Sequence, residues 1–373
     1  MKKKSFFQNS AVQTIVTSLI CILAGVLISY IVLLIIAPHG ATQAIITIIL
    51  NFLTRTGAPA QMKALGNTLV KTAPLLMCAL SVCFCYKVGL FNIGAAGQYV
   101  AGAGASLVGA LIFHLPWYVC LIMAAIAGAI LGMITGALKA YRNVNEVISG
   151  IMLNWITLYL VNTVLSQPAS KDLASPYTVD INSVNPSGLI PSMGLGALFA
   201  NNRNVTIAIP LAIIIAILLW VVLTKTKFGY ELIATGYSKE AAKYSGMKEK
   251  QNILKTLAIG GALAGIGASF LFLSGYMKWE TTQSSVPAMG FNGIAATFLG
   301  GLHPIGTIFA SFFIQNVLDG GALIDRMLYP SQISDMMFGI IIYGSAFVLF
   351  TKNLMNRRQT KVTKSKKKEG EQA

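Results

Sequence analysis

Long apolar runs, separated by short polar segments, dominate the chain. Ten of them approach the roughly 20 residues that a helix needs to cross a hydrocarbon core about 30 Å thick. They lie near residues 11–37, 67–86, 97–113, 116–138, 146–165, 205–223, 253–275, 288–301, 304–319 and 334–350. The eighth and ninth runs are short, and a further apolar run, residues 45–53, is too short to span. We expect that run to lie at the membrane interface or to be tucked into the bundle.

A glycine-rich stretch interrupts the apolar pattern at residues 89–98, GLFNIGAAGQ. It places three glycines, Asn92 and Gln98 where one predicted span gives way to the next. Unpaired backbone groups cost several kcal/mol each in lipid, so irregular backbone survives there only against protein or a wet cavity. We therefore expect the break to be buried or to line a pore. A glycine-rich cytoplasmic turn is the alternative.

A short internal echo links this break to the other end of the chain. The sequence GLFNI at residues 89–93 is similar to GFNGI at residues 290–294, and both precede runs of small residues. Paired glycine-interrupted segments are typical of membrane proteins built from structural repeats with discontinuous helices, which flank the substrate path. The echo thus indicates a pseudo-repeat.

The composition agrees with the apolar pattern. Hydrophobic residues make up 55% of the chain and charged residues only 11%, which is too little polar surface for a soluble globule. We predict an all-α, polytopic transmembrane helix bundle of about ten spans with discontinuous helices. The predicted parts are an N-terminal extension with the first span (residues 1–66), a core (residues 67–350) and a basic tail (residues 351–373).

Charge sets the predicted orientation, because Lys and Arg are retained on the cytoplasmic side. With both termini inside, 21 of the 28 Lys and Arg residues fall on that side. The densest part of the net charge of +16 is the tail KVTKSKKKEGEQA, which has no aromatic residues interleaved. Topology and anionic lipid explain the tail better than nucleic acid does. The run after the opening MKKK is longer than a usual cleavable signal region, so we take it as the first span.

The cysteines and histidines form no pattern of a disulfide framework or a metal site. The five cysteines all lie in predicted spans, which excludes an extracellular disulfide framework: Cys21, Cys78, Cys83, Cys85 and Cys120. The three histidines are scattered and have no zinc-ligand spacing. We therefore expect no metal or cofactor. Neither the histidines nor the acidic residues form the convergent set that a membrane-embedded enzyme needs.

Two polar excursions lie outside the predicted spans. Residues 166–204, rich in Pro, Ser, Asn and Gly, form a long extracellular loop that either receives a partner or caps the bundle. Residues 228–252 form the only sizeable polar insertion on the cytoplasmic side. In it, Ser238 is placed to cap a short helix and Gly246 to lie just past its end. Such a helix suits docking into a groove on another protein; an ordinary solvated loop is the alternative.

The polar residues in the spans are mostly neutral. Acidic residues fall near span ends, whereas an ion-coupled transporter needs them deep in the membrane. Neutral amides can exchange hydrogen bonds with an uncharged polar solute, although each can also simply join helices. The candidate pathway residues are Asn92, Gln98, Glu146, Asn154, Asn292, Gln315 and Asn316.

Four segments, taken together, resemble a known family. They are residues 89–103, 145–156, 228–247 and 290–311, and they occur in this order. They resemble permease subunits of bacterial ABC importers of the sugar, nucleoside and branched-chain amino acid type. The resemblance covers residues 67–350. The sequence is most similar to nucleoside permeases that work with a basic-membrane-type binding lipoprotein.

The resemblance implies a multi-pass pore subunit in a bacterial cell membrane, which is not itself an enzyme. A partner ABC ATPase is implied to grip the cytoplasmic loop at Gly236, Glu240, Ala241, Ala242 and Gly246. The chain has no GxxxxGK[ST] phosphate loop, in agreement with ATP hydrolysis by another subunit. The long N-terminal extension implies a second, different permease subunit and a heterodimeric pore. An extracellular binding lipoprotein completes the implied complex. Import of a sugar or a branched-chain amino acid, and ion-coupled secondary transport, are the alternatives.

Overall fold

The computed structural model describes residues 10–330 and, beyond them, residues 333, 336–337, 339–340 and 343–344. The predicted tenth span, residues 334–350, lies largely outside the described residues, and the predicted tail, residues 351–373, lies wholly outside them. In the described part the ordered elements are helices, and only isolated β-bridges join extended segments. The chain is thus a helical bundle, as the apolar pattern predicts.

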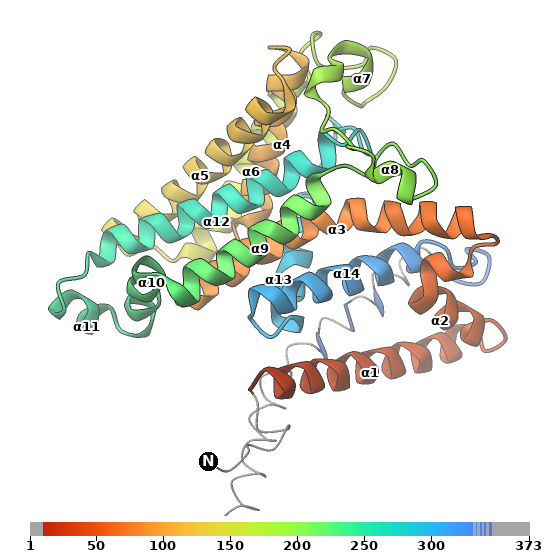
Figure 1. Cartoon of the computed structure of the whole chain (residues 1–373), viewed down its shortest axis with the longest axis horizontal. Coiled ribbons are helices and arrows are strands. Elements are labelled where there is room, and N and C mark those ends of the chain that lie inside the picture. Colours follow the sequence, from red (N-terminus) through yellow and green to blue (C-terminus); the bar gives the residue numbers. More distant parts are fainter. Residues whose placement is uncertain (1–9, 331–332, 334–335, 338, 341–342, 345–373) are drawn as a thin grey trace, which may run out of the picture.

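Five helices are long and apolar enough to cross a membrane. They are α3 (Ala58–Lys87), α5 (Trp117–Arg142), α6 (Glu146–Leu165), α9 (Ala208–Lys225) and α12 (Glu249–Phe272). Helix α3 begins nine residues before the predicted span at residue 67. The bounds of α6 coincide with the predicted span 146–165. Figure 1 shows α5, α9 and α12 running in roughly the same direction, with α5 packed against α12.

Three shorter helices complete the centre of the bundle: α4 (Ala95–Leu111), α13 (Met289–Leu299) and α14 (Pro304–Gly321). Eleven residues give α13 a length of about 16 Å, roughly half of the hydrocarbon thickness. The predicted eighth span, residues 288–301, thus contains a helix that is shorter than the hydrocarbon is thick. A tight turn through Gly301 and Leu302, both at positive φ, joins α13 to α14.

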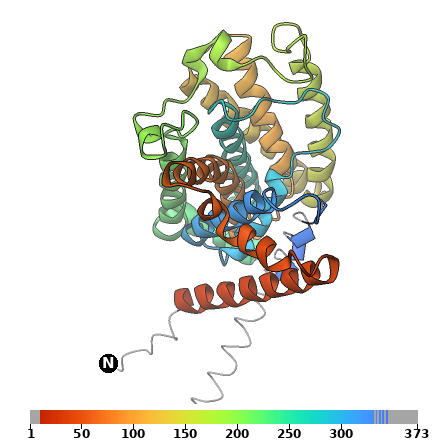
Figure 2. The same cartoon turned by 90° about the vertical axis from the view of Figure 1, so that its right-hand side faces the viewer.

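The N-terminal helices lie against one side of this bundle. Helix α1 (Ser10–Ile36) runs along the lower edge, as Figure 2 shows, and is followed by α2 (Ala41–Leu50) and a 3-10 turn, η2 (Asn51–Thr54). Helix α2 packs against α14, where Gly320 contacts the backbone of Ile48. The short apolar run at residues 45–53 therefore packs one face against the bundle, while Ile46, Ile49, Leu50 and Leu53 on its other face stay exposed.

Helices α5 and α12 meet along a seam of glycines. Gly128 and Gly132 on α5 face Gly261 and the backbone of Leu257 on α12. A side chain at any of these glycines would overlap the backbone of the facing helix. The four-residue spacing puts these glycines on one helix face. Small residues at this spacing let the backbones of membrane helices approach closely. The seam, defined by Gly128, Gly132, Gly261 and Gly265, is thus a direct contact between the backbones of α5 and α12.

The glycine-rich break forms the turn between α3 and α4. Helix α3 ends at Lys87 and α4 begins at Ala95, with Gly89 at a φ of 75°. Asn92 and Gln98 are 1% and 0% exposed, so the prediction that the break is buried is confirmed. Its counterpart Gly290 rests against Ala96 at the start of α4. The second echo segment thus begins against the helix that follows the first, although residues 89–93 form a turn and residues 290–294 lie within α13.

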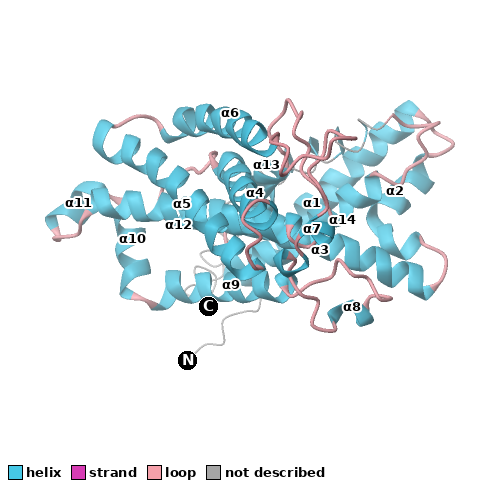
Figure 3. Ribbon diagram, turned by 90° about the horizontal axis from the view of Figure 1, so that it is seen from above, coloured by secondary structure: helices cyan, strands magenta, loops and turns pink. Residues whose placement is uncertain are grey.

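The long polar excursion is an ordered cap at one end of the bundle. It carries three short helices: α7 (Ile181–Val184), η3 (Pro186–Gly188) and α8 (Leu195–Leu198). Asn185 donates to the backbone oxygens of Ala110 and Leu115 at 3.0 and 2.9 Å, and Asn202 donates to Asn67 at 2.8 Å. Figures 1 and 3 show α7 and α8 far from α10 (Lys227–Tyr237) and α11 (Lys239–Tyr244), which lie at the opposite end.

Candidate functional site

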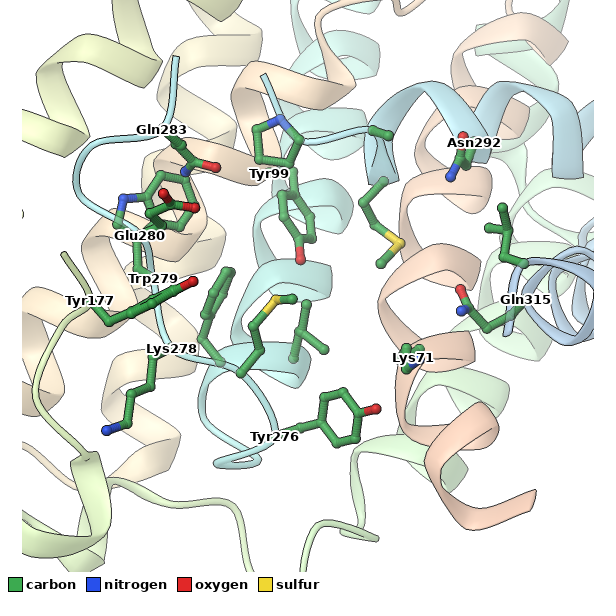
Figure 4. A pocket seen from close by; sticks show the side chains of 17 residues that line it. Lys71, Tyr99, Tyr177, Tyr276, Lys278, Trp279, Glu280, Gln283, Asn292 and Gln315 are labelled. Atoms are coloured by element: carbon green, nitrogen blue, oxygen red, sulfur yellow. The ribbon is translucent and has the colours of Figure 1, made fainter. Parts of the chain in front are cut away.

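A cavity of about 770 Å³ opens between the central helices and the segment that joins α12 to α13. Lys71 of α3, Tyr99 of α4, Asn292 of α13 and Gln315 of α14 contribute polar groups to its wall. Figure 4 shows Asn292, Gln315 and Lys71 on one side and Trp279, Glu280 and Gln283 on the other, with Tyr99 between them. The volume suits a small organic solute.

An ion pair closes one wall of the cavity. The Lys71 ammonium lies 2.6 Å from Asp319 Oδ1, and it also lies 5.5 Å from the centre of the Tyr276 ring. Thr68 Oγ1 donates to Asp319 Oδ2 at 2.9 Å, and Gln315 Nε2 donates to Asp319 Oδ1 at 2.9 Å. The carboxylate therefore joins α3 to α14 and cancels the charge that Lys71 brings to the wall.

The opposite wall is held by the cap formed by residues 166–204. Trp279 is 1% exposed, and its indole N–H donates to Asn162 Oδ1 at 3.0 Å, while Asn162 Nδ2 donates to the backbone oxygen of Gln283 at 2.9 Å. Thr178, in the cap, exchanges backbone and side-chain hydrogen bonds with Trp279. The segment joining α12 to α13 is thus fixed between α6 and the cap.

At the other end of the bundle, α10 and α11 form an L-shaped arm. Ser238 caps α11 by accepting from the Ala241 N–H at 3.2 Å, and Gly246, just past the helix, has a φ of 78°. Both placements confirm the sequence prediction. Tyr237 and Tyr244 are 88% and 93% exposed, so the arm presents large aromatic side chains to its surroundings.

The arm also contacts the glycine-rich break. Gly236 of α10 lies directly against the backbone of Val88 and Gly89, where neither glycine has room for a side chain. On its other side, Thr235 accepts from Asn252 Nδ2, near the start of α12, at 2.9 Å. A force on the arm therefore reaches both the α3–α4 turn and α12 through direct contacts.

The family described as the permease component of branched-chain amino acid transport systems matches residues 64–346. The chain belongs to this family. It is therefore a permease subunit, with the multi-pass helical character that its apolar helices indicate.

Three relatives match most of this chain and most of their own length. The permease is 30% identical over 317 residues to the nucleoside ABC transporter permease NupB of Lactococcus lactis, covering 83% of this chain and 87% of that protein. It is 31% identical to the guanosine ABC transporter permease NupP of Bacillus subtilis, covering 74% and 79%. It is 29% identical to the glucose ABC transporter permease TsgB13 of Haloferax volcanii, covering 74% of each chain. The recognition of an ABC importer permease from the sequence motifs is thus confirmed.

Of the seven predicted pathway residues, Asn292 and Gln315 line the cavity. Asn92 and Gln98 instead pair with each other, at 2.8 and 3.2 Å, beneath the break. Asn154 accepts from the Gly97 N–H at 2.7 Å and so joins α6 to α4. In this structure these three amides connect helices.

The two remaining pathway candidates also lie away from the cavity. Asn316 accepts from Asn51 Nδ2 at 3.2 Å and donates to the backbone oxygen of Ile49 at 2.8 Å. Glu146 forms an ion pair with Lys139, Nζ to Oε2 2.8 Å, across the turn between α5 and α6. A direct role in the pathway stays a prediction for all seven residues.

The residues implied in ATPase coupling all lie in or beside the arm. Gly236 packs on the break, Ala242 is buried, and Glu240 and Ala241 are exposed on α11. Gly246 faces open space, with no neighbouring atom within 4 Å of the position of a side chain. The arrangement leaves one face of α11 free for a partner, and the partner's identity remains a proposal.

Sequence reasoning missed several residues of the cavity wall. Lys71 and Asp319 are the only charged residues in the predicted spans 67–86 and 304–319, and ionisable residues inside a membrane usually pair. Applying that rule to the sequence would have predicted the ion pair between Lys71 and Asp319. Tyr276 and Trp279 follow α12 in an aromatic-rich run, GYMKWE, which is a weaker signal. Tyr99, one residue after the break, carries no signal of its own.

Proposed function

We propose that this permease forms part of the pore of an ATP-driven importer and that its cargo is a nucleoside. The cavity carries the argument. Lys71 on its wall is neutralised by Asp319, and Lys278 and Glu280 lie together on the opposite side, so amides, tyrosine hydroxyls and apolar side chains between them meet the cargo. Neutral hydrogen-bonding groups beside aromatic rings suit a solute with hydroxyl groups and a flat base. The relatives NupB and NupP, named for nucleoside and guanosine transport, support this choice.

The driving force comes from a partner ABC ATPase that docks on the arm. Gly236, Glu240, Ala241, Ala242 and Gly246 are the proposed coupling residues. The exposed aromatic side chains of the arm and its contacts with the break and α12 support this role. ATP-driven closure of the partner would push α11 and thereby shift the α3–α4 turn, and with it α4, whose Tyr99 lines the cavity.

The proposed complex has two further components, and the placement of the two ends of the bundle agrees with them. A binding lipoprotein delivers the nucleoside to the outer cap, and a second permease subunit completes a heterodimeric pore. The permease crosses a bacterial plasma membrane about ten times, with both termini inside. The opposite positions of the outer cap and the arm support this orientation. Residues 1–66, 67–350 and 351–373 remain the proposed parts of the chain.

Reconstitution tests the proposal. The permease, its partner permease, the ATPase and the binding lipoprotein are placed in liposomes, and uptake of labelled inosine, guanosine and uridine is followed with and without ATP. We expect ATP-dependent uptake of at least one of them. The absence of any nucleoside uptake in vesicles that hydrolyse ATP would contradict the cargo assignment, and uptake by the permease alone would contradict the ATP-driven mechanism.

Sugar import is the second candidate, because TsgB13 is named for glucose. The same liposomes distinguish the two cargoes. Glucose or galactose uptake that exceeds nucleoside uptake would favour the sugar, and leucine serves as the branched-chain amino acid probe.

A further inference from the structure

The orientation of the Gln315 amide is fixed by its neighbours. Asp319 is ion-paired with Lys71 and accepts from Thr68, so its oxygens act as acceptors only. Gln315 must therefore turn its NH₂ group toward Asp319 Oδ1, at 2.9 Å. The carbonyl oxygen Oε1 of Gln315 is then the group left for other contacts.

That oxygen has no protein donor within the described part of the chain, although the Gln315 residue is only 4% exposed. Because Gln315 lines the cavity, its free surface faces that space. An unpartnered acceptor in a nearly closed wall that still opens to a cavity can be reached by a donor on a ligand, so this oxygen is suited to bind one. The opposite orientation would place two donors toward the cavity, and the Asp319 carboxylate excludes it.

Two further polar groups on the cavity wall share this property. Neither the Tyr99 hydroxyl nor the Asn292 amide has a hydrogen-bond partner among the described residues. Figure 4 shows the Tyr99 hydroxyl pointing into the open space between the two walls. Phe272 and Met289 supply apolar surface beside these groups. A ligand here meets one acceptor of fixed direction and two groups that are free to donate or accept.

We propose that Gln315 Oε1 is a fixed acceptor for a donor on the transported nucleoside, and that Asp319 is the positioning residue that keeps it so. This inference rests on the proposed function. It assigns selectivity to the permease itself, beyond that of the binding lipoprotein. The donor is either an N–H of the base or a hydroxyl of the ribose, since both present the same chemistry to the oxygen.

Uptake by the complete reconstituted complex tests the proposal. The probes are inosine, 1-methylinosine, which lacks the N1–H, and 2′-deoxyinosine and 3′-deoxyinosine, which each lack one ribose hydroxyl. Each uptake rate is divided by that of inosine, for the native permease and for Gln315→Leu. The binding lipoprotein is the same in both complexes, so its own preference cancels.

We expect the native complex to disfavour at least one analogue by an extra factor of about two to ten, the effect of one neutral hydrogen bond, relative to the Gln315→Leu complex. The analogue identifies the donor. Equal ratios in the two complexes for every analogue would overturn the proposal. If the native complex takes up no nucleoside, the proposed function fails, and this inference fails with it. Gln43→Leu, the same change at an exposed position on α2, is the matched control and should keep the native ratios.

The positioning role of Asp319 has a separate readout. In Asp319→Asn, the new amide can donate to Gln315 Oε1, so Gln315 is free to turn and discrimination against the analogue should fall although Gln315 is intact. Asp319→Glu keeps an acceptor-only carboxylate and should retain the discrimination. A purely structural role would lower uptake of all four probes equally in both variants, and that result would overturn the assignment to Asp319.

Discussion

Helix α12 takes part in two very different contacts. Toward α5 it presents Gly261 and Gly265, and the two backbones touch without intervening side chains. Near its other end, Leu271 and Phe272 face a cavity of about 770 Å³. The seam has little room for sliding, because a shift forces backbone atoms together, whereas the cavity wall is made of side chains, several of them on the short helices α13 and α14. We therefore expect α5 and α12 to move as one body during transport and the cavity wall to rearrange against them.

The largest expected effect comes from breaking the seam. A leucine in Gly261→Leu would overlap the carbonyl of Gly128, so α5 and α12 would have to separate. We expect a loss of more than about 3 kcal/mol of stability and little folded protein. Thermal unfolding in detergent, followed by size-exclusion chromatography, measures this. Ile130→Ala, at an exposed position on α5, is the control and should unfold near the native temperature. A native-like Gly261→Leu would show that the seam is not tight.

The ion pair of the cavity wall should matter less. Asp319→Leu leaves the Lys71 ammonium without its partner, and we expect a loss of about 2 kcal/mol, which is typical of a hydrogen bond to a charged group. Adding Lys71→Met removes the stranded charge and should restore part of the lost stability. A double-mutant cycle of unfolding temperatures measures the coupling. Additive effects of the two changes would contradict a direct interaction.

A sequence pattern predicts local structure better than it predicts which distant residues contact each other. The caps of α11 at Ser238 and Gly246 and the bounds of α6 follow from neighbouring residues, and they were predictable. The buried break was also predictable, because lipid excludes unpaired backbone. Each of these features depends on residues that are close in the chain.

Partners far apart in the chain were not foreseen. Lys71 and Asp319 are separated by 248 residues, and the amide pair of Asn92 and Gln98 forms only once the break has folded. An amide inside a span has the same sequence signature whether it joins helices or faces a cavity. Sequence reasoning therefore selected Asn292 and Gln315 together with amides such as Asn154, and only the packing separates them.

A smaller effect on stability is expected from a change in the arm, which lies away from both the seam and the cavity. Gly246→Leu places a side chain at a φ of 78°, which costs about 1 kcal/mol, in a position with no neighbours. The permease should stay folded, with uptake falling while the ATPase continues to hydrolyse ATP. Gly246→Asn tolerates this backbone conformation and should unfold closer to the native temperature. Normal uptake by Gly246→Leu would contradict a role of this position in coupling.

The smallest expected effect concerns the turn between α13 and α14. His303 Nδ1 accepts from the Ile305 N–H at 3.2 Å and so caps α14. The pKa of His303 lies below its usual 6.5, because partial burial disfavours the imidazolium and because Lys87 is nearby. Its contribution to stability is complete above pH 6.5 and is lost as the pH falls through the lowered pKa.

Unfolding temperatures between pH 8 and pH 5 check this point. His303→Asn keeps a capping side chain but does not titrate. It should therefore show a smaller fall in stability than the native permease on acidification. An equal fall in both would exclude His303 as the source of the pH dependence.

The central claim, that cargo passes the cavity between α3, α12, α13 and α14, is tested most directly by cysteine labelling. In a chain with Cys21→Ala, the other four native cysteines are buried, so background reaction should be low. Asn292→Cys is treated with a small water-soluble thiol reagent in the reconstituted complex, with Ile156→Cys on the exposed face of α6 for comparison. We expect labelling at position 292 that saturating nucleoside slows during ATP turnover, and little labelling at position 156. Labelling at position 292 that nucleoside does not change would contradict the account.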